Sequence, residues 1–212
     1  MAKTLYASGA ALRRRMQQLR PYACPVEVLL SVSPENGSVL DVGCGSGLFL
    51  GLLLLSGRSI DATGLDISEP ALQSATHMRD TGLPAAQRER LTLLHVQSIA
   101  DWPDQTFDMV SLIDVMHHVQ PSQRLALFEA VAARVKPGGM LLYKDMVRRP
   151  RWRAFFNWLH DLVIARDWIR YSPIAFIDTA AKNAGFIPVR AEIFNRLWYG
   201  HELRVYRRRM TS

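Results

Sequence analysis

The sequence lacks the features that mark secreted, membrane-spanning or metal-stapled chains. Its 212 residues include two cysteines, Cys24 and Cys44, and neither has a metal-type partner nearby, which argues against a metal site. No run approaches the roughly 18 apolar residues of a membrane span, because the stretch 48–55 has only the length of a core helix. The first ten residues lack a signal peptide's apolar centre, so we expect a cytoplasmic protein.

Lysine is also scarce, since arginine supplies 22 of the 26 basic residues that give a net charge of +7. The arginines cluster at 13–15, 148–153 and 204–209. Such patches can bind nucleic acid, anionic lipid or an acidic carrier protein, and they can equally serve only solubility. The rest of the composition, 49% hydrophobic and 21% charged, is ordinary for a globular protein. The length predicts a single domain over 1–212 with a sizeable core.

Apolar runs separated by turn residues predict alternating strands and helices, without repeats or low-complexity linkers. Strands are expected at 39–42, 60–65, 91–96, 107–113 and 140–144. Helices are expected at 48–56, 68–82, 122–135 and 174–184, the third of them stopping at 136–139. This alternation favours a mostly parallel sheet with helices on both faces. Two final strands, at 187–194 and 202–207, are expected to close it as an antiparallel pair. The N-terminal part, 1–33, is expected to carry a basic amphipathic helix at 11–20 and a short helix at 26–31.

The most informative motif follows the first predicted strand, where three glycines alternate with small residues in Gly43-Cys44-Gly45-Ser46-Gly47. Glycine allows a sharp turn and a close approach of ligand to backbone, and a helix that starts there offers N–H groups to a polar ligand. Asp66 stands nineteen residues after Gly47, at the end of the next predicted strand. In open α/β sheets an acid at that place accepts ribose hydroxyls.

Two other nucleotide motifs do not fit this loop. A dinucleotide site has the spacing G-x-G-x-x-G, and its third glycine, counted from Gly43, would fall on Leu48. A P-loop requires Gly-Lys-Ser/Thr, which does not follow here.

The glycine loop and the acid together resemble motif I of the class I S-adenosylmethionine (SAM) methyltransferases, of the type 11/12-like small-molecule kind. Segments 107–110 and 136–139 resemble the later motifs of that family in order and spacing, so the resemblance spans about 26–209. It implies SAM as cofactor and a Rossmann-like α/β fold. That fold has a seven-stranded sheet with five parallel strands, a closing antiparallel hairpin, and helices on both faces.

The resemblance also implies which residues contact the cofactor. Asp66 would bind ribose, Asp41 would orient the loop and the ammonium of SAM, and Asp114 would lie near that ammonium unless it caps a helix. The full set of implied cofactor residues is Asp41, Gly43, Cys44, Gly45, Gly47, Asp66, Ile67, Ser98, Ile99, Ile113 and Asp114. One departure is clear, because many relatives carry an adenine-binding Asp after the third strand and this chain has Gln97-Ser98-Ile99. Gln97, Ser98 or Asp101 would have to replace it. Cys44 itself is interpreted as a small residue that fills the loop rather than a nucleophile.

Residues that could act on a methyl acceptor follow the fourth and fifth strands. His117 and His160 are the candidate general bases, with Asp145 or Asp161 as an orienting acid. His118 is expected to be structural, and adjacent residues on a helix point to different sides. The same geometry makes the two histidines a poor metal pair, and no metal is expected. Lys144 and Asp145 could steady the acceptor or pair with each other.

The segment 148–173 is an insertion rich in arginine and aromatic residues. In the family, segments at this place often cap the acceptor pocket, and an aromatic stripe on one helical face favours an apolar or aromatic acceptor. The insertion could instead cover core, or contact a membrane surface through its tryptophans and arginines.

Three functions therefore stay open. The first is a SAM-dependent methyltransferase for a small acceptor, apolar, aromatic or carrier-tethered, with O-methylation favoured. The second is an RNA- or protein-directed methyltransferase that uses the basic patches. The third is a non-catalytic subunit of the same fold that binds a partner. Nucleobase amino methylation is disfavoured, because Ile113-Asp114-Val115-Met116 stands where an Asn-Pro-Pro-Tyr type of sequence would be needed.

Overall fold

The computed structural model describes residues 5–6, 26–147, 172–196 and 199–210. The chain groups into two compact units, Met1–Met109 and Val110–Ser212, and each is described by itself. The expected single domain over 1–212 stays a prediction. The predicted helix at 11–20 and most of the 148–173 insertion lie outside the described residues.

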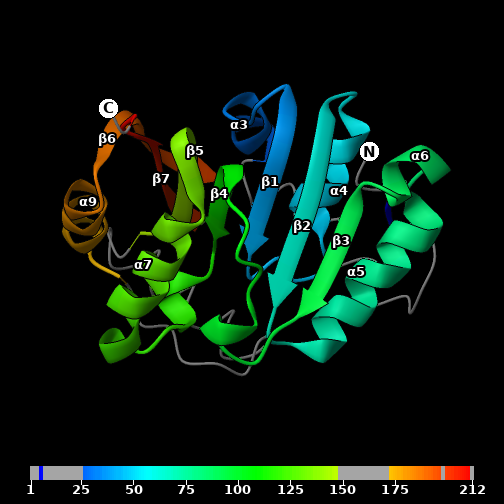
Figure 1. The fold of residues 1–212 in the computed structure, drawn as a ribbon, viewed down its shortest axis with the longest axis horizontal. Helices are drawn as coiled ribbons and strands as arrows, with labels where there is room; N and C mark the ends of the chain where they lie inside the picture. Colours follow the sequence, from blue (N-terminus) through cyan, green and yellow to red (C-terminus); the bar gives the residue numbers. More distant parts are fainter. Residues whose placement is uncertain (1–4, 7–25, 148–171, 197–198, 211–212) are drawn as a thin grey trace. The chain divides into compact units, whose positions relative to one another are not determined.

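The first unit is built on three parallel strands, which Figure 1 shows side by side. The strands are β1 (Asn36–Val42), β2 (Ser59–Asp66) and β3 (Leu91–His95). The helices are α3 (Val26–Ser31), α4 (Leu48–Leu55), α5 (Glu69–Gly82), α6 (Ala85–Arg88) and the short 3₁₀ helix η1 (Ile99–Asp101). The β1–β2 register pairs Val42 with Leu65, so both strands end together at the edge that carries the glycine loop.

The second unit contains the antiparallel part of the sheet. Its helices are α7 (Arg124–Ala133), α9 (Ile174–Asn183) and the 3₁₀ helices η2 (Met116–His118) and η3 (Pro121–Gln123). Its strands are β5 (Val135–Met146), β6 (Phe186–Arg196) and β7 (Tyr199–Arg208), and β7 pairs antiparallel with both β5 and β6. The strand β4 (Phe107–Ile113) runs across the boundary between the units.

The strand order of the sheet is β3-β2-β1-β4-β5-β7-β6. A parallel part closed by an antiparallel hairpin confirms the predicted Rossmann-like α/β class with seven strands.

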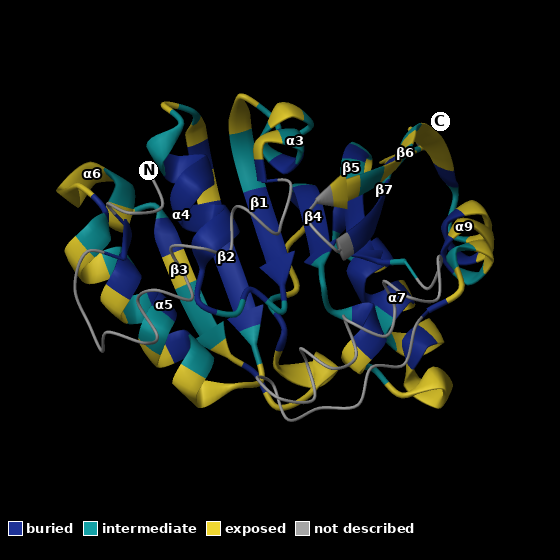
Figure 2. Cartoon of the chain, turned by 180° about the vertical axis from the view of Figure 1, so that it is seen from behind, coloured by how far each residue is buried: buried dark blue, intermediate teal, exposed yellow. Residues whose placement is uncertain are grey.

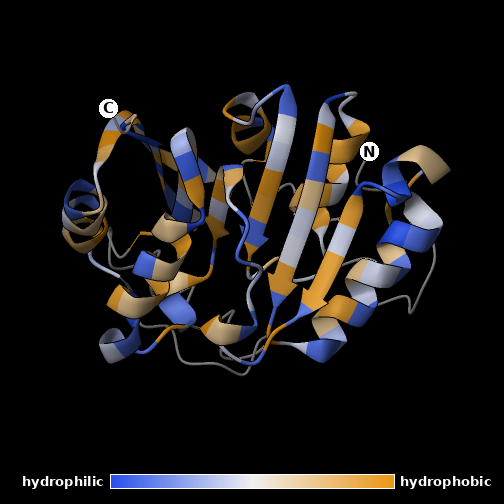
Figure 3. Ribbon diagram, viewed as in Figure 1, coloured by the Kyte–Doolittle hydropathy of each residue, from blue (hydrophilic) through white to orange (hydrophobic). Residues whose placement is uncertain are grey.

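Local sequence explains why these elements form. Every residue of α4 from Leu48 to Leu54 is buried, as Figure 2 shows, and a helix that is apolar all round belongs inside a core. The helix ends before Gly57, whose φ of +82° suits a helix C-terminus. Helix α5 instead alternates polar and apolar residues (Figure 3) and buries Leu72, Ala75 and Met78 on one face.

Ser68 caps α5 as predicted, because its side chain accepts a hydrogen bond from the backbone N–H of Ala71 at 3.4 Å. Other boundaries differ from the prediction. Helix α7 ends at Ala133 rather than at 135, and Val135 already begins β5. The segment 136–139, predicted as a stop, therefore lies within that strand, where Gly138 takes a φ of +77°. The prediction treated the Pro-Gly-Gly run only as a helix breaker, although a strand with a glycine irregularity can contain it.

No helix among the described residues is long and apolar enough to span a membrane.

Candidate functional site

The glycine loop after β1 has the backbone that its sequence predicts. Gly43, Gly45 and Gly47 all have positive φ, at +74°, +57° and +77°, a region that other residues rarely adopt. The backbone N–H groups of Gly43 and Cys44 both donate to the carbonyl of Leu65, at 2.8 and 2.9 Å. The backbone of the loop is therefore hydrogen-bonded to the end of β2.

Asp66 is a second fastening point for the same loop. Its Oδ2 accepts a hydrogen bond from the N–H of Gly45 at 2.7 Å, and its Oδ1 accepts one from the N–H of Ser68 at 2.8 Å. An ionised carboxylate has about four acceptor positions, so each oxygen retains room for a further donor. This carboxylate can hold the loop and the start of α5 while it also accepts two hydroxyl groups of a ribose.

Tyr6 also contacts this loop, which the sequence did not predict. Its side chain is buried, and its hydroxyl donates to the carbonyl of Ser46 at 2.8 Å. The two residues are forty positions apart, and no local sequence pattern predicts that they are in contact.

Cys44 packs inside the loop. Its side chain is buried, and burial raises the pKa of its thiol far above the ordinary value, helped by the nearby carboxylates Asp41 and Asp66. A thiol held protonated in this way is inert as a nucleophile. A Cβ atom added at Gly64 would lie 2.8 Å from the Cys44 sulfur, so β2 needs a glycine where this side chain packs. Asp41 is buried as well.

The turn after β3 contains a capping box around η1. Asp101 Oδ2 accepts from the N–H groups of Gln97 and Ser98, at 2.9 and 2.8 Å, and from the Ser98 hydroxyl at 3.2 Å. The hydrogen bonds from Gln97 and Ser98 lower the pKa of Asp101. Gln97, Ser98 and Asp101, the candidates to replace the missing adenine-binding acid, are thus hydrogen-bonded to one another. The sequence pattern Ser-x-x-Asp is typical of a capping box and could have revealed this arrangement. Ile67 and Ile99 are exposed, and both stay predicted cofactor contacts.

An ion pair follows the end of β4, with the side chain of Lys144 buried and that of Asp114 partly buried. Lys144 Nζ lies 2.7 and 2.5 Å from the two oxygens of Asp114, and the N–H of Asp114 donates to the Lys144 carbonyl at 2.8 Å. Burial alone would raise the pKa of Asp114, but Lys144 outweighs it and holds the pKa well below its usual range. The suggested pairing of Lys144 with Asp145 is wrong, because successive residues of a strand point to opposite faces.

Asp114 is not a helix cap either, since Val115 occupies the N-cap position of η2. Its φ of +57° is the only positive value of a non-glycine residue among those described. Aspartate tolerates this conformation better than most side chains. The geometry holds the carboxylate against Lys144 at the turn that follows Ile113, three residues before His117.

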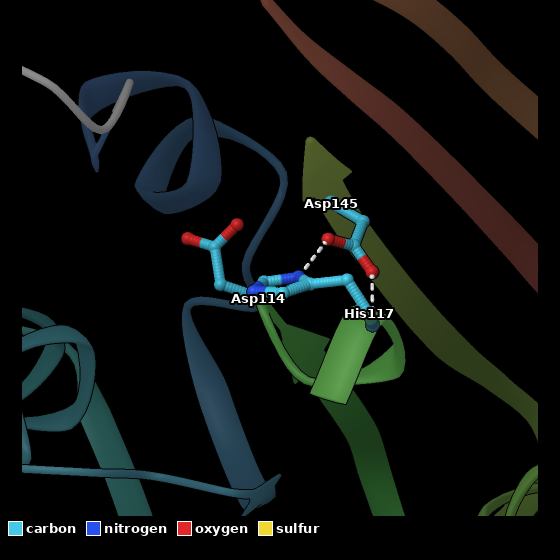
Figure 4. A group of neighbouring side chains, drawn as sticks. All are labelled: Asp114, His117 and Asp145. Atoms are coloured by element: carbon cyan, nitrogen blue, oxygen red, sulfur yellow. Dashed lines mark hydrogen bonds and ion pairs between the residues drawn. The ribbon is translucent and has the colours of Figure 1, made fainter. Parts of the chain in front are cut away.

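His117 and Asp145 form the second polar pair of this unit (Figure 4). Asp145 Oδ1 lies 2.5 Å from His117 Nδ1, and Oδ2 accepts from the His117 backbone N–H at 3.2 Å. Both residues are only 1% exposed. Because an ionised carboxylate can only accept, the proton belongs on Nδ1, which makes Nε2 the nitrogen that can act as a base. His118 is exposed, while His160 and Asp161 lie outside the described residues.

Two further donors complete the surroundings of Asp145. The N–H of Met146 donates to Oδ1 at 2.7 Å, and the buried Tyr143 hydroxyl donates to Oδ2 at 3.3 Å. Burial, followed by the charge of Asp145, raises the pKa of Tyr143 well above its ordinary value. The role of Tyr143 was missed because its position two residues before Asp145 shows a shared strand face but not a shared hydrogen bond.

Ligand atoms of Asp114, His117 and Asp145 lie within 4.8 Å of one another (Figure 4), a donor set that could hold a divalent cation. Both carboxylates already have partners within the chain, because the Lys144 ammonium contacts both Asp114 oxygens and His117 Nδ1 contacts Asp145. With these contacts within the chain, the arrangement supports proton transfer at His117.

A groove of about 500 Å³ lies elsewhere in the first unit, along α5 and β3. Its lining residues are Glu69, Leu72, Gln73, Thr76, His77, Asp80, Leu93 and His95. None of them belongs to the glycine loop or the predicted cofactor set.

Comparison with known proteins gives a consistent relationship. The methyltransferase-domain family matches residues 11–191. A ubiquinone biosynthesis O-methyltransferase of Alkalilimnicola ehrlichii is 34% identical over 160 residues, which is 72% of this chain and 62% of that protein. The corresponding protein of Idiomarina loihiensis is 28% identical over 64% of this chain and 51% of its own length. The chain thus spans about half to three fifths of these relatives.

Solved structures share the fold. An O-methyltransferase family protein of Burkholderia thailandensis superposes with a TM-score of 0.73 and 19% identity, covering 98% of this chain and 62% of its own. Magnesium protoporphyrin IX methyltransferase of Synechocystis, solved with bound SAM, gives a TM-score of 0.69 and 18% identity, covering 97% of this chain and 88% of its own.

Proposed function

This chain belongs to the methyltransferase-domain family, and from that premise we propose that it transfers a methyl group from SAM to a hydroxyl group of a small molecule. One observation carries the proposal above the others. The acid after β2 and the glycine loop after β1 are already joined, through the 2.7 Å hydrogen bond from Gly45 to Asp66. That joint supports binding of a ribose and an adjoining polar group at this edge.

The residues of the first unit fit SAM as cofactor. Asp66 would accept the ribose hydroxyls, and the left-handed glycines would let the backbone approach the methionine part. Asp41, Cys44, Ile67, Ser98 and Ile99 complete the proposed contacts in this unit, and Ile113 and Asp114 are proposed from the second. SAM supplies a methyl group on a sulfonium, whose sulfur leaves readily.

With such a donor, alignment of the acceptor and exclusion of water can supply much of the rate. A hydroxyl acceptor must also lose its proton, and a positioned imidazole is suited to take it near neutral pH. His117 would take that proton on Nε2. Asp145 would hold the Nδ1 proton in place and stabilise the imidazolium that forms, as the 2.5 Å contact supports. His160 stays a proposed alternative base.

The names of the relatives support O-methylation of a small acceptor. The finer proposal is an apolar, aromatic or carrier-tethered acceptor, which the aromatic composition of 148–173 favours. Peripheral contact with a membrane through the arginine clusters belongs to the same proposal. The RNA- or protein-directed alternative draws its support from the three arginine clusters and the net charge of +7. The non-catalytic alternative does not explain why Asp66 is joined to the glycine loop or why His117 is paired with Asp145.

Calorimetry with SAM, S-adenosylhomocysteine and NAD tests the cofactor assignment. We expect micromolar affinity for the first two and weaker binding of NAD. Tighter binding of NAD than of SAM would overturn the assignment, whatever the acceptor proves to be.

A further inference from the structure

A third carboxyl stands beside the His117–Asp145 pair. Glu202 in β7 is the residue directly opposite Asp145 in β5. Side chains of directly opposite residues in an antiparallel pair share one face, with Cβ atoms about 5 Å apart. Glu202 is 6% exposed, so both carboxyls lie in the same buried environment.

Of the two carboxyl groups, Asp145 and Glu202, we expect Asp145 to stay ionised. Its four acceptor positions receive four donors: His117 Nδ1, the N–H groups of His117 and Met146, and the Tyr143 hydroxyl. Protonating Asp145 would sacrifice at least one of these bonds. No hydrogen bond to the Glu202 carboxyl is found within the described ranges, so Glu202 loses less when it takes a proton.

The other charged groups on this face of the β6–β7 hairpin do not change which of the two carboxyls takes a proton more readily. Arg204 in β7 lowers the pKa of Glu202, but it also contacts Asp178 of α9 at 3.5 Å. Burial, the charge of Asp145 and the charge of Asp178 act in the opposite sense and raise the pKa of Glu202 to about 7. Opposite Glu202 in β6 stands Ile193, which carries no charge. From β5, the titratable side chains of Tyr143 and Asp145 share this face with Glu202, and His117 of η2 contacts Asp145.

We propose that Glu202 is a positioning residue of the proposed base, acting through Asp145. In its neutral form it leaves a single negative charge beside His117. When Glu202 ionises, a second negative charge favours the imidazolium. His117 then binds a proton more strongly, but a smaller fraction of it is neutral and able to accept one. The inference rests on the proposed role of His117 in methyl transfer, although the coupling of the three groups does not depend on the acceptor.

Carbon-13 NMR titration of the intact protein tests the coupling without any acceptor. The probes are the side-chain carboxyl signals of glutamate and the ring signals of His117, followed from pH 4 to 9 in three proteins. These are the wild type, Glu202→Gln, which mimics the neutral acid, and Glu192→Gln as a matched control. Glu192 lies in β6 opposite Leu203 and pairs with Arg190, so its removal changes the charge by the same amount on the other face.

We expect one glutamate signal that titrates near pH 7 in the wild type and in Glu192→Gln but is absent in Glu202→Gln. The titration of the His117 ring should move to lower pH in Glu202→Gln, which lacks the second negative charge, and should stay at its wild-type position in Glu192→Gln. If Glu202 titrates with ordinary carboxyls near pH 4 to 5, or if His117 responds identically in all three proteins, the proposal is wrong. Coupling without methyl transfer would instead count against the proposed function alone.

Discussion

Asp66 Oδ2 lies 2.7 Å from the backbone nitrogen of Gly45, so the acid that ends β2 holds the glycine loop that follows β1. The same carboxylate accepts from Ser68 at the start of α5. A residue predicted only as a ligand contact therefore also sets the shape of the loop. Replacement of Asp66 should therefore change both the affinity for the ligand and the conformation of the loop.

The first prediction follows from this double role. Asp66→Ala should weaken SAM binding by at least the 1–3 kcal/mol that an unpaired buried polar group costs, because both the ribose acceptor and the loop anchor are lost. Calorimetry measures the change. Asp61→Ala is the control, since Asp61 lies exposed on the same strand and, among the described residues, forms an ion pair with Arg90 alone. Equal affinity of the wild type and Asp66→Ala would remove Asp66 from the cofactor site.

The second prediction concerns the packing of Cys44 against β2. Gly64→Ala should destabilise the fold by about 1–3 kcal/mol, because the new methyl group would lie 2.8 Å from the Cys44 sulfur. Cys44→Ala should recover much of that loss in the double variant, which urea unfolding of the four proteins in the cycle would show. Additive effects of the two substitutions would mean that the two side chains do not compete for this space.

The third prediction addresses the base. His117→Ala should lower the turnover number by roughly 10²-fold or more while the affinity for SAM stays unchanged, because His117 is proposed to act on the acceptor. Asp145→Asn should resemble it, since the amide cannot favour the imidazolium. His118→Ala, which removes the exposed neighbour, is the control. Full activity of His117→Ala would leave His160 or alignment alone as the source of catalysis.

The fourth prediction concerns the ion pair of Lys144 and Asp114. Lys144→Met should destabilise the protein by on the order of 3 kcal/mol at pH 7, because it strands a carboxylate. Asp114→Asn in the same protein should restore part of the loss, and asparagine also tolerates the positive φ at this position. Urea unfolding measures both effects.

The same pair predicts a pH dependence. The pKa of Asp114 is depressed in the folded protein, so its contribution to stability is complete above the unfolded value of about 3.9 and is lost as the pH falls below it. In Lys144→Met, burial raises the pKa of Asp114 without the opposing ammonium, so the variant's carboxyl takes a proton at a higher pH than that of the wild type. The gap in unfolding free energy between the wild type and Lys144→Met should therefore shrink as the pH falls from 7 to 3. A constant gap from pH 7 to pH 3 would show that Asp114 does not depend on Lys144 for its charge.

The sequence could predict whatever depends on short-range pattern. The glycine loop, the Ser68 cap and the limits of β4 follow from residues within a few positions of one another, and each was found where it was expected. The end of α7 was misplaced because Val135 and the residues after it satisfy both a helix end and a strand start. Only pairing of Met140–Met146 with β7 decides that this stretch belongs to one long strand.

The polar contacts of the second unit could not be predicted, because they depend on register. Asp145 meets Glu202 only through the pairing of β5 with β7. Lys144 reaches Asp114 rather than its own neighbour because the alternation of a strand separates residues 144 and 145. A sequence lists such charges but does not assign partners to them.

The central claim, transfer of a methyl group from SAM to a small hydroxyl acceptor, is tested most directly by mass spectrometry of a panel of small hydroxyl compounds, aromatic and aliphatic, with and without apolar tails, incubated with SAM. We predict that at least one acceptor gains a methyl ether together with an equal amount of S-adenosylhomocysteine, and that Asp66→Ala and His117→Ala abolish or greatly reduce the product. Turnover on RNA or protein with none on any small hydroxyl compound would contradict the account.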